Sequence, residues 1–216
     1  RCVPAATALA REAEAAGAII HERSEVTRLD HGPKCVAVTQ NGSVEAEHVL
    51  LAGNGYLPNL EPRVASMVMP VNSFIGATAP LGDLAAEVLS QDIAACDSSN
   101  VVNYFRLSED GRLLFGGRAN FRLKFPSDIG GTLHKRMGAM FPQVAHVPFE
   151  YRWGGTLGVS LRRLPYVARV RGNVLSASGY VGHGVALSGM AGRVMAEAVA
   201  RLQRRDGAVG HDARQP

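Results

Sequence analysis

The residues that could do chemistry gather in one glycine-rich turn near the C-terminus. Residues 179–184 read Gly-Tyr-Val-Gly-His-Gly, and they separate an apolar run at 173–178 from a long amphipathic segment at 185–205. This order predicts a strand, a turn and a helix, whose first amides are unpaired and carry partial positive charge. Since glycine lets a ligand press against the main chain, the turn suits a phosphate or the anionic edge of a ring. On spacing alone, a tight turn without a ligand explains these residues equally well.

His183 is the one histidine inside this turn. An imidazole there could donate a hydrogen bond to a ring or a substrate, or transfer a proton. A histidine placed only by the needs of the backbone fits the sequence as well. The turn does not have the spacing of a dinucleotide fingerprint or a P-loop, and no nucleophile elbow is present. The histidines and cysteines include no pair at ligand spacing on one element, so we predict no metal site.

The elements around this turn are predicted to mix helices and strands. An alanine-rich helix opens the chain, and Asn41-Gly42 marks a hairpin because a type I′ turn needs positive φ at both central residues. We predict helices at 4–16, 83–89 and 128–141, and strands at 18–21, 25–29, 35–39, 43–46, 48–52, 67–78, 103–107 and 112–116.

The composition excludes several classes of protein. Hydrophobic residues make up 46% of the 216 residues, which is too many for a disordered chain, and glycine is in excess at 24. No apolar run is long enough to cross a membrane. The formal net charge is only +4 and the basic residues are spread out, so we expect no nucleic-acid partner. Cys2, Cys35 and Cys96 are far apart, which favours free thiols in a reducing cytoplasm.

Several motifs together resemble a known family. GYVGHGV at 179–185, followed by MAGR at 190–193, resembles the C-terminal flavin loop and helix of the D-amino acid oxidase superfamily of FAD-dependent oxidoreductases, and within it the γ-glutamylputrescine oxidase group. Other stretches agree in order: VLLAGNGY at 49–56, MPVNSFIGATAPL at 69–81, NYFRL at 103–107 with RLLFGG at 112–117, and WGG at 153–155 with RLP at 163–165. Their order makes the resemblance more specific than any one of them.

The resemblance implies FAD as the cofactor and a set of residues around it. In chain order these are Val26, Ala52, Gly53, Asn54, Gly155, Gly179, Tyr180, Val181, Gly182, His183, Gly184 and Val185. The backbone near Val26 would meet the adenine, and residues 52–54 would lie by the diphosphate and ribose. Gly155 and residues 179–185 would line the isoalloxazine ring. A helix amino terminus beside that ring would stabilise the negative charge of the reduced flavin.

The implied reaction is the oxidation of an amine. In the family, hydride passes from the carbon of a C–N bond to flavin N5, and the imine product is hydrolysed. The resemblance identifies no catalytic base. Tyr104 and Trp153 are expected to wall the substrate pocket, and Arg106, Arg118 or Arg163 to hold a distal carboxylate. A core role for the two aromatic residues, and a structural or solvated role for the arginines, stay open.

Two departures from relatives in the family narrow the substrate. Glycine-oxidase-like relatives carry an arginine four residues after the tryptophan, where this chain has Leu157. Sarcosine-oxidase-like relatives carry a lysine two residues after the His-Gly pair, where this chain has Ala186. Because both usual anchors for an α-carboxylate are absent, an amine such as γ-glutamylputrescine fits the sequence better.

The resemblance also implies a division into domains and a missing part. We expect an α/β (α+β) chain with a partial Rossmann-like FAD-binding domain at 1–56 and 151–216, and an antiparallel β-sheet substrate domain with helices at 57–150. The family begins with a βαβ unit that binds the FAD pyrophosphate, and this unit is not found here. We therefore expect the C-terminal portion of the enzyme, which the missing segment or another chain would complete. The alternatives are a non-catalytic fragment that binds no flavin, or an anion-binding module unrelated to flavin.

Overall fold

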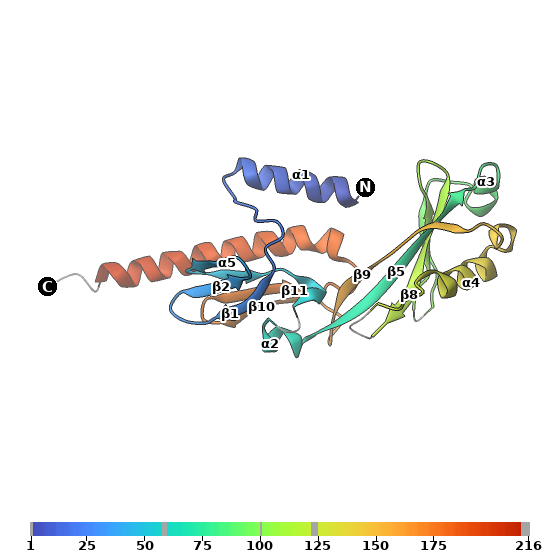
Figure 1. The fold of residues 1–216 in the computed structure, drawn as a ribbon. Helices are drawn as coiled ribbons and strands as arrows, with labels where there is room; N and C mark the ends of the chain where they lie inside the picture. Colours follow the sequence, from blue (N-terminus) through green and yellow to red (C-terminus); the bar gives the residue numbers. More distant parts are fainter. Residues whose placement is uncertain (1, 58–59, 100, 122–124, 213–216) are drawn as a thin grey trace. The chain divides into compact units, whose positions relative to one another are not determined.

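The chain forms two compact units. A computed structural model describes residues 2–57, 60–99, 101–121 and 125–212 (Figure 1). One unit consists of Arg1–Met69 with Val159–Pro216, and the other of Pro70–Gly158. The two units divide the chain at 69/70 and 158/159, further along than the predicted boundaries at 56/57 and 150/151. The reason is that both boundaries fall within long strands. Val68–Pro80 begins in the first unit and continues in the second, and Phe149–Ser160 begins in the second unit and ends in the first.

The first unit contains two small sheets and a long helix. Its elements are α1 (Cys2–Ala15), β1 (Val26–Asp30), β2 (Cys35–Thr39), β3 (Ser43–Ala46), β4 (Val49–Leu51), the 3₁₀ turn η1 (Asn54–Tyr56), α2 (Pro62–Ala65), β10 (Tyr166–Arg171), β11 (Val174–Ser178) and α5 (Gly184–Asp212). One sheet has the order β1-β2-β3 and is antiparallel. The other has the order β10-β11-β4, in which β11 is antiparallel to β10 and parallel to β4.

Local sequence signals explain several of these elements. The predicted hairpin between β2 and β3 forms, and the Thr39 amide donates to the Gly42 carbonyl at 2.8 Å. The type I′ turn expected there is wrong, because neither Asn41 nor Gly42 has positive φ. Gly17 follows the end of α1 with φ of 93°, a conformation that glycine adopts without strain. The strand predicted at 18–21 is wrong. This run takes no place in either sheet, and Ile19 is 80% exposed.

The core of the first unit lies on the two faces of the β10-β11-β4 sheet. Leu51 and Val174 belong to a cluster that also includes Leu29 and Val64. Leu175 and Ala177 belong to a second cluster, formed with Tyr180 and with Ala191 and Met195 of α5. β11 therefore contributes side chains to both clusters, which explains why all five of its residues are buried and why it reads as a continuous apolar run.

The second unit is a five-stranded sheet with helices packed against it. Its elements are β5 (Val68–Pro80), α3 (Leu84–Val88), β6 (Ala94–Cys96), β7 (Tyr104–Leu107), β8 (Arg112–Asn120), α4 (Gly130–Met140), the 3₁₀ turn η2 (Pro142–Val144) and β9 (Phe149–Ser160). The strand order is β6-β7-β8-β5-β9, and the β6–β7, β7–β8 and β5–β8 pairs are antiparallel. Phe74, Leu113 and Phe115 of the sheet pack with Leu133 and Met137 of α4. The predicted fold class is confirmed.

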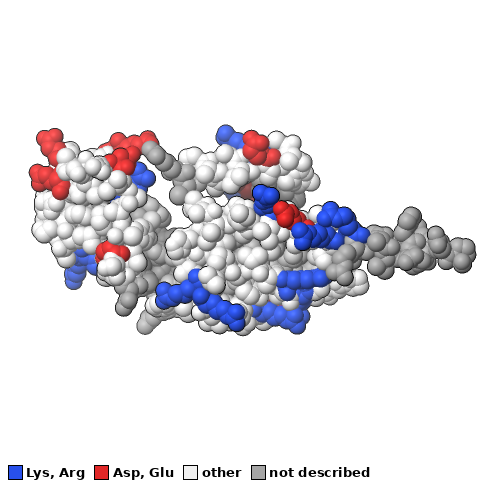
Figure 2. Space-filling view, turned by 180° about the vertical axis from the view of Figure 1, so that it is seen from behind, with Lys and Arg blue, Asp and Glu red and all other residues white. Residues whose placement is uncertain are grey.

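The surface carries both signs of charge. Figure 2 shows Lys and Arg in several separate groups on the described part of one face, with no continuous basic stripe there. Among the described residues, none of the helices combines the length and the apolar character that crossing a bilayer requires.

Candidate functional site

Two loops that follow parallel neighbouring strands form the candidate site. β4 and β11 pair in register, Val49 with Val174 and Leu51 with Ser176, so their carboxyl ends lie at the same edge of the sheet. Residues 52–54 leave β4 there, and residues 179–184 leave β11. Ligands of open α/β sheets bind outside the carboxyl ends of parallel strands. The fold therefore brings two groups of the predicted cofactor residues to one place, although they are far apart in the sequence.

A hydrogen bond joins the two loops. The amide of Gly179 donates to Oδ1 of Asn54 at 2.9 Å. Asn54 has φ of 49° and Gly179 has φ of 73°, so both residues occupy the left-handed region. Asparagine tolerates this region better than most residues that carry a side chain. The sequence pointed to both loops, but not to this contact.

The turn after β11 has an unusual backbone. Val181 has φ of 54° and Gly182 has φ of 90°. A β-branched residue at positive φ is strained, and such residues persist where the surrounding structure holds them. Tyr180 lies between them and β11, where it forms an isolated bridge with Val159 and its hydroxyl donates to the Ala177 carbonyl at 3.2 Å. Burial raises the pKa of Tyr180, so its phenol stays neutral and keeps this bond.

The amino end of α5 presents backbone donors. The His183 amide donates to the Tyr180 carbonyl at 3.0 Å, and the Ala186 and Leu187 amides donate to the His183 carbonyl. The amides of Gly184 and Val185 come before the first bonded amide of the helix, so helix geometry gives them no acceptor. The space beside Gly182 is open, because a Cβ on this residue would meet no atom within 4 Å. A turn with small residues and outward amides fits an anionic or planar group such as a flavin edge.

Not every glycine in the two loops points to a ligand. A Cβ on Gly53 would lie 2.8 Å from Cδ2 of Leu57, so close packing alone requires glycine there. A Cβ on Gly184 would make only ordinary contacts with the Tyr180 ring. The histidine of the turn, His183, is exposed, and the described residues give its side chain no hydrogen-bond partner.

Two predicted cofactor residues lie elsewhere in the chain. Val26 begins β1, where it pairs with Thr39 in the other sheet of the first unit. Gly155 lies in β9, within the second unit. Within the described residues, no hydrogen bond connects either of them to the two loops.

Three of the predicted substrate residues share one face of the sheet in the second unit. Phe105 and Leu107 of β7 pack on the core, so the alternating residues Tyr104 and Arg106 point to the opposite face. In β9, a Cβ on Gly154 would meet the core residue Phe74, so the preceding Trp153 also points away from the core, and it is 43% exposed. Arg163 belongs to the first unit, and the side chain of Arg118 lies outside the described part of the chain.

The bonding of these side chains limits their roles. The Tyr104 hydroxyl lies 3.0 Å from Oγ of Ser73, and its ring covers Gly116, where a Cβ would collide with it. Arg106 donates from Nη2 to Asp92 and from Nε to the Leu107 carbonyl, both at 3.0 Å. Tyr104 is therefore held rigidly in the face of the sheet, whereas Arg106 already has a carboxylate partner.

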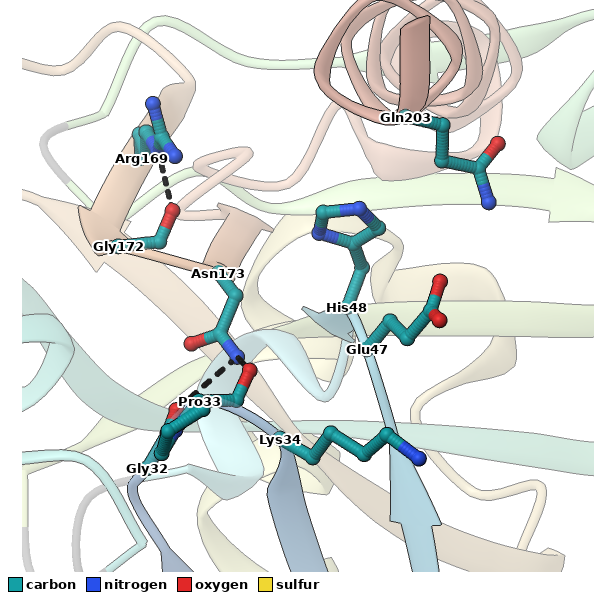
Figure 3. Close-up of a pocket in the computed structure, with 9 residues that line it drawn as sticks. All are labelled: Gly32, Pro33, Lys34, Glu47, His48, Arg169, Gly172, Asn173 and Gln203. Carbon is teal, nitrogen blue, oxygen red and sulfur yellow. Dashed lines mark hydrogen bonds between the residues drawn. The ribbon is translucent and has the colours of Figure 1, made fainter. Parts of the chain in front are cut away.

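A cavity lies at the other end of the parallel strands. It measures about 790 Å³, and His48 and Asn173, which line it, directly precede β4 and β11 (Figure 3). Lys34, Arg169 and Gln203 also line this space. Nδ1 of His48 is buried, and the described residues offer it no partner. Sequence reasoning missed this cavity because its lining comes from separate segments that share no motif.

Comparisons with known proteins identify the family. The description "DAO: FAD dependent oxidoreductase" matches residues 2–198. "Probable oxidoreductase OrdL" of Rhizobium meliloti is 40% identical over 190 residues, which are 88% of this chain and 44% of that protein. "Gamma-glutamylputrescine oxidoreductase" of Escherichia coli is 34% identical over 183 residues, which are 84% of this chain and 43% of that protein.

Solved structures agree with this assignment. Glycine oxidase from Geobacillus kaustophilus superposes with a TM-score of 0.75 at 25% identity, over 91% of this chain and 53% of that one. L-proline dehydrogenase from P. horikoshii shares the fold with a TM-score of 0.67 at 17% identity, over 84% of this chain and 50% of that one.

The chain belongs to the DAO family of FAD-dependent oxidoreductases. The predicted family, the oxidoreductase class and FAD as the family's cofactor are thereby confirmed. The chain spans less than half the length of the curated relatives it matches.

Proposed function

We propose that this chain forms part of an FAD-dependent enzyme that oxidises an amine at a C–N bond. The observation that carries the proposal is the pair of loops at the carboxyl ends of β4 and β11, joined through Asn54 and Gly179, in a chain of the DAO family. When bound, FAD supplies the chemistry by accepting a hydride from the substrate carbon.

The protein's part is to bind and orient the cofactor. We assign the diphosphate and ribose to Ala52, Gly53 and Asn54, and the isoalloxazine ring to residues 179–185. The amides of Gly184 and Val185, which have no acceptor among the described residues, would face the ring edge that becomes negative, where a helix amino terminus is stabilising. Val26 and Gly155 keep their proposed places at the adenine and the ring.

An amine without an α-carboxylate is the proposed substrate class. Leu157 and Ala186 stand where carboxylate anchors are expected in relatives, and the E. coli relative is named for γ-glutamylputrescine. We propose that Tyr104 and Trp153 wall the substrate pocket. Arg163 is a better candidate than Arg106 for a distal carboxylate, because Arg106 is already paired with Asp92.

The proposed domains follow from these roles. Residues 1–56 and 151–216 would form the FAD-binding part, and residues 57–150 the substrate-binding part, of a cytoplasmic enzyme. Completion by a further segment or another chain is part of the proposal. It is supported by apolar side chains left exposed in the first unit, including Val185 at 72% and Met190 at 63%.

The alternative is a non-catalytic fragment that binds no flavin alone. The observation in its favour is the coverage of only 43–44% of the curated relatives. The two proposals differ in one simple property, which is whether the purified chain holds flavin.

The test is to purify the chain, add FAD, remove unbound cofactor and record the visible absorption. We expect a flavin spectrum that bleaches anaerobically with γ-glutamylputrescine, and less with glycine or sarcosine. A chain that stays colourless after FAD is added would support the fragment. Bound flavin that bleaches with glycine alone would contradict the proposed substrate class.

A further inference from the structure

We infer that Asn54 is a positioning residue, which sets the start of the turn at 179–184 through its side chain. The inference rests on the proposed function only for the identity of the ligand. Its evidence is the 2.9 Å bond from the Gly179 amide to Oδ1, which links residues 125 positions apart. Asn54 was expected to contact the cofactor directly, whereas its oxygen is already used within the protein.

Position 54 makes two demands that few residue types meet together. The backbone has φ of 49°, which favours glycine, asparagine or aspartate. The side chain must also place an acceptor at the Gly179 amide. Glycine meets only the first demand, because it has no side-chain acceptor. Asparagine and aspartate meet both, so the residue type is explained by the contact rather than by the turn alone.

The Asn54 hydrogen bond holds the turn at Gly179, the first residue after β11. A Cβ there would lie 3.1 Å from Cβ of Ser160 and 3.2 Å from Cγ2 of Val68, and φ is 73°. Packing and the Asn54 bond thus fix the peptide from which Val181 and Gly182 continue at positive φ. Because the first amides of α5 follow directly, a change at Asn54 should alter where those amides point.

The fixed oxygen also orients the rest of the amide. Since Oδ1 faces an N–H donor, the opposite end of the side chain must be the amino group. In the part of the chain that the structure describes, Nδ2 has no hydrogen-bond acceptor. Asn54 therefore leaves a donor group unused at the carboxyl edge of the sheet.

The experiment measures exchange and chemical shift of backbone amides in the chain without FAD. N54G keeps the backbone conformation but removes the acceptor, and N54D keeps both. N173A is the matched control. The Asn173 side chain donates to the Gly32 and Pro33 carbonyls, and Asn173 lies at the amino end of β11, away from the two loops. All variants are compared by NMR under conditions in which each remains folded.

We expect the Gly179 amide to exchange about three- to tenfold faster in N54G, the effect of one lost hydrogen bond. The shifts of the Gly182 and Gly184 amides should move with it. N54D should restore both readouts, and N173A should change neither. Unchanged exchange of Gly179 in N54G would overturn the inference, and so would a uniform rise in exchange at all amides. Since no flavin is present, failure here is distinct from failure to bind FAD.

Discussion

Arg171 holds the carboxylate of Glu61, with Nε 3.0 Å from Oε2 and Nη2 3.3 Å from Oε1. The Glu61 side chain is fully buried, and it also accepts from the Arg63 amide at 3.1 Å and lies 3.2 Å from Nε2 of His31. One carboxylate thereby connects the end of β10, the start of α2 and the turn after β1.

Replacing Glu61 by glutamine should destabilise the chain. The substitution keeps the shape but removes the charge that Arg171 and the Arg63 amide face, and hydrogen bonds to a charged group contribute about 1.5–3 kcal/mol. We expect the free energy of unfolding to fall by about 2 kcal/mol in urea titrations. E45Q is the control, because the Lys34–Glu45 pair is exposed and should contribute less than about 1 kcal/mol. Equal losses in both variants would contradict this role of Glu61.

The same carboxylate should make stability depend on acid pH. Burial acts to raise the pKa of Glu61, but hydrogen bonds from Arg171 and the Arg63 amide outweigh it, and the net direction is downward from 4.5. A group whose pKa is lower in the folded state contributes stability above its unfolded pKa, and this is lost as pH falls through the folded value. The free energy by which the wild-type chain is more stable than E61Q should therefore decrease below about pH 4.5. A constant difference from neutral to strongly acid pH would disprove it.

Gly116 should tolerate no side chain while Tyr104 keeps its place. A Cβ on Gly116 would collide with the Tyr104 ring, so G116A must displace the ring or the strand, at a cost of about 1–3 kcal/mol. G172A is the matched control, because nothing lies within 4 Å of a Cβ there. Thermal unfolding should show a lower midpoint for G116A alone. If Tyr104 walls the substrate pocket, G116A should also weaken amine binding in a flavin-loaded enzyme.

The N54D variant should separate the role of the Asn54 amide oxygen from that of its amino group once FAD is bound. N54D keeps the acceptor for Gly179 but replaces the free amino group with a carboxylate, which would repel a diphosphate. We expect N54D to bind FAD more weakly than wild type while its Gly179 amide stays protected. Tight FAD binding by N54D would place the diphosphate away from residue 54. Titration followed by flavin fluorescence measures this affinity.

The sequence predicted the elements whose signals are local. The strand, glycine-rich turn and helix at 173–205 follow from neighbouring residues. The hairpin at Asn41-Gly42 forms as predicted, although its turn does not have the positive φ angles of type I′. β9 and β10 were missed, because Gly154 and Gly155 interrupt one and arginines alternate along the other. The run at 18–21 is apolar, but the described structure gives it no strand to pair with.

The rest of the candidate site depends on contacts that no local pattern encodes. Asn54 and Gly179 were both singled out, yet their hydrogen bond exists only because β4 and β11 are parallel neighbours. No local pattern predicts the burial of Glu61, since its partners Arg171 and His31 lie far away in the sequence. His48 is a further example, because it contributes a buried nitrogen to a cavity that no sequence motif predicts.

The most direct test of the account is to map where FAD changes the backbone amides of the chain. A titration followed by two-dimensional NMR should shift amides at 53–54 and 179–185, at the carboxyl ends of β4 and β11. Amides around the cavity at Lys34, His48 and Asn173 should stay in place. Shifts confined to that cavity, or no shifts at saturating FAD, would contradict the assignment of the two loops to the cofactor.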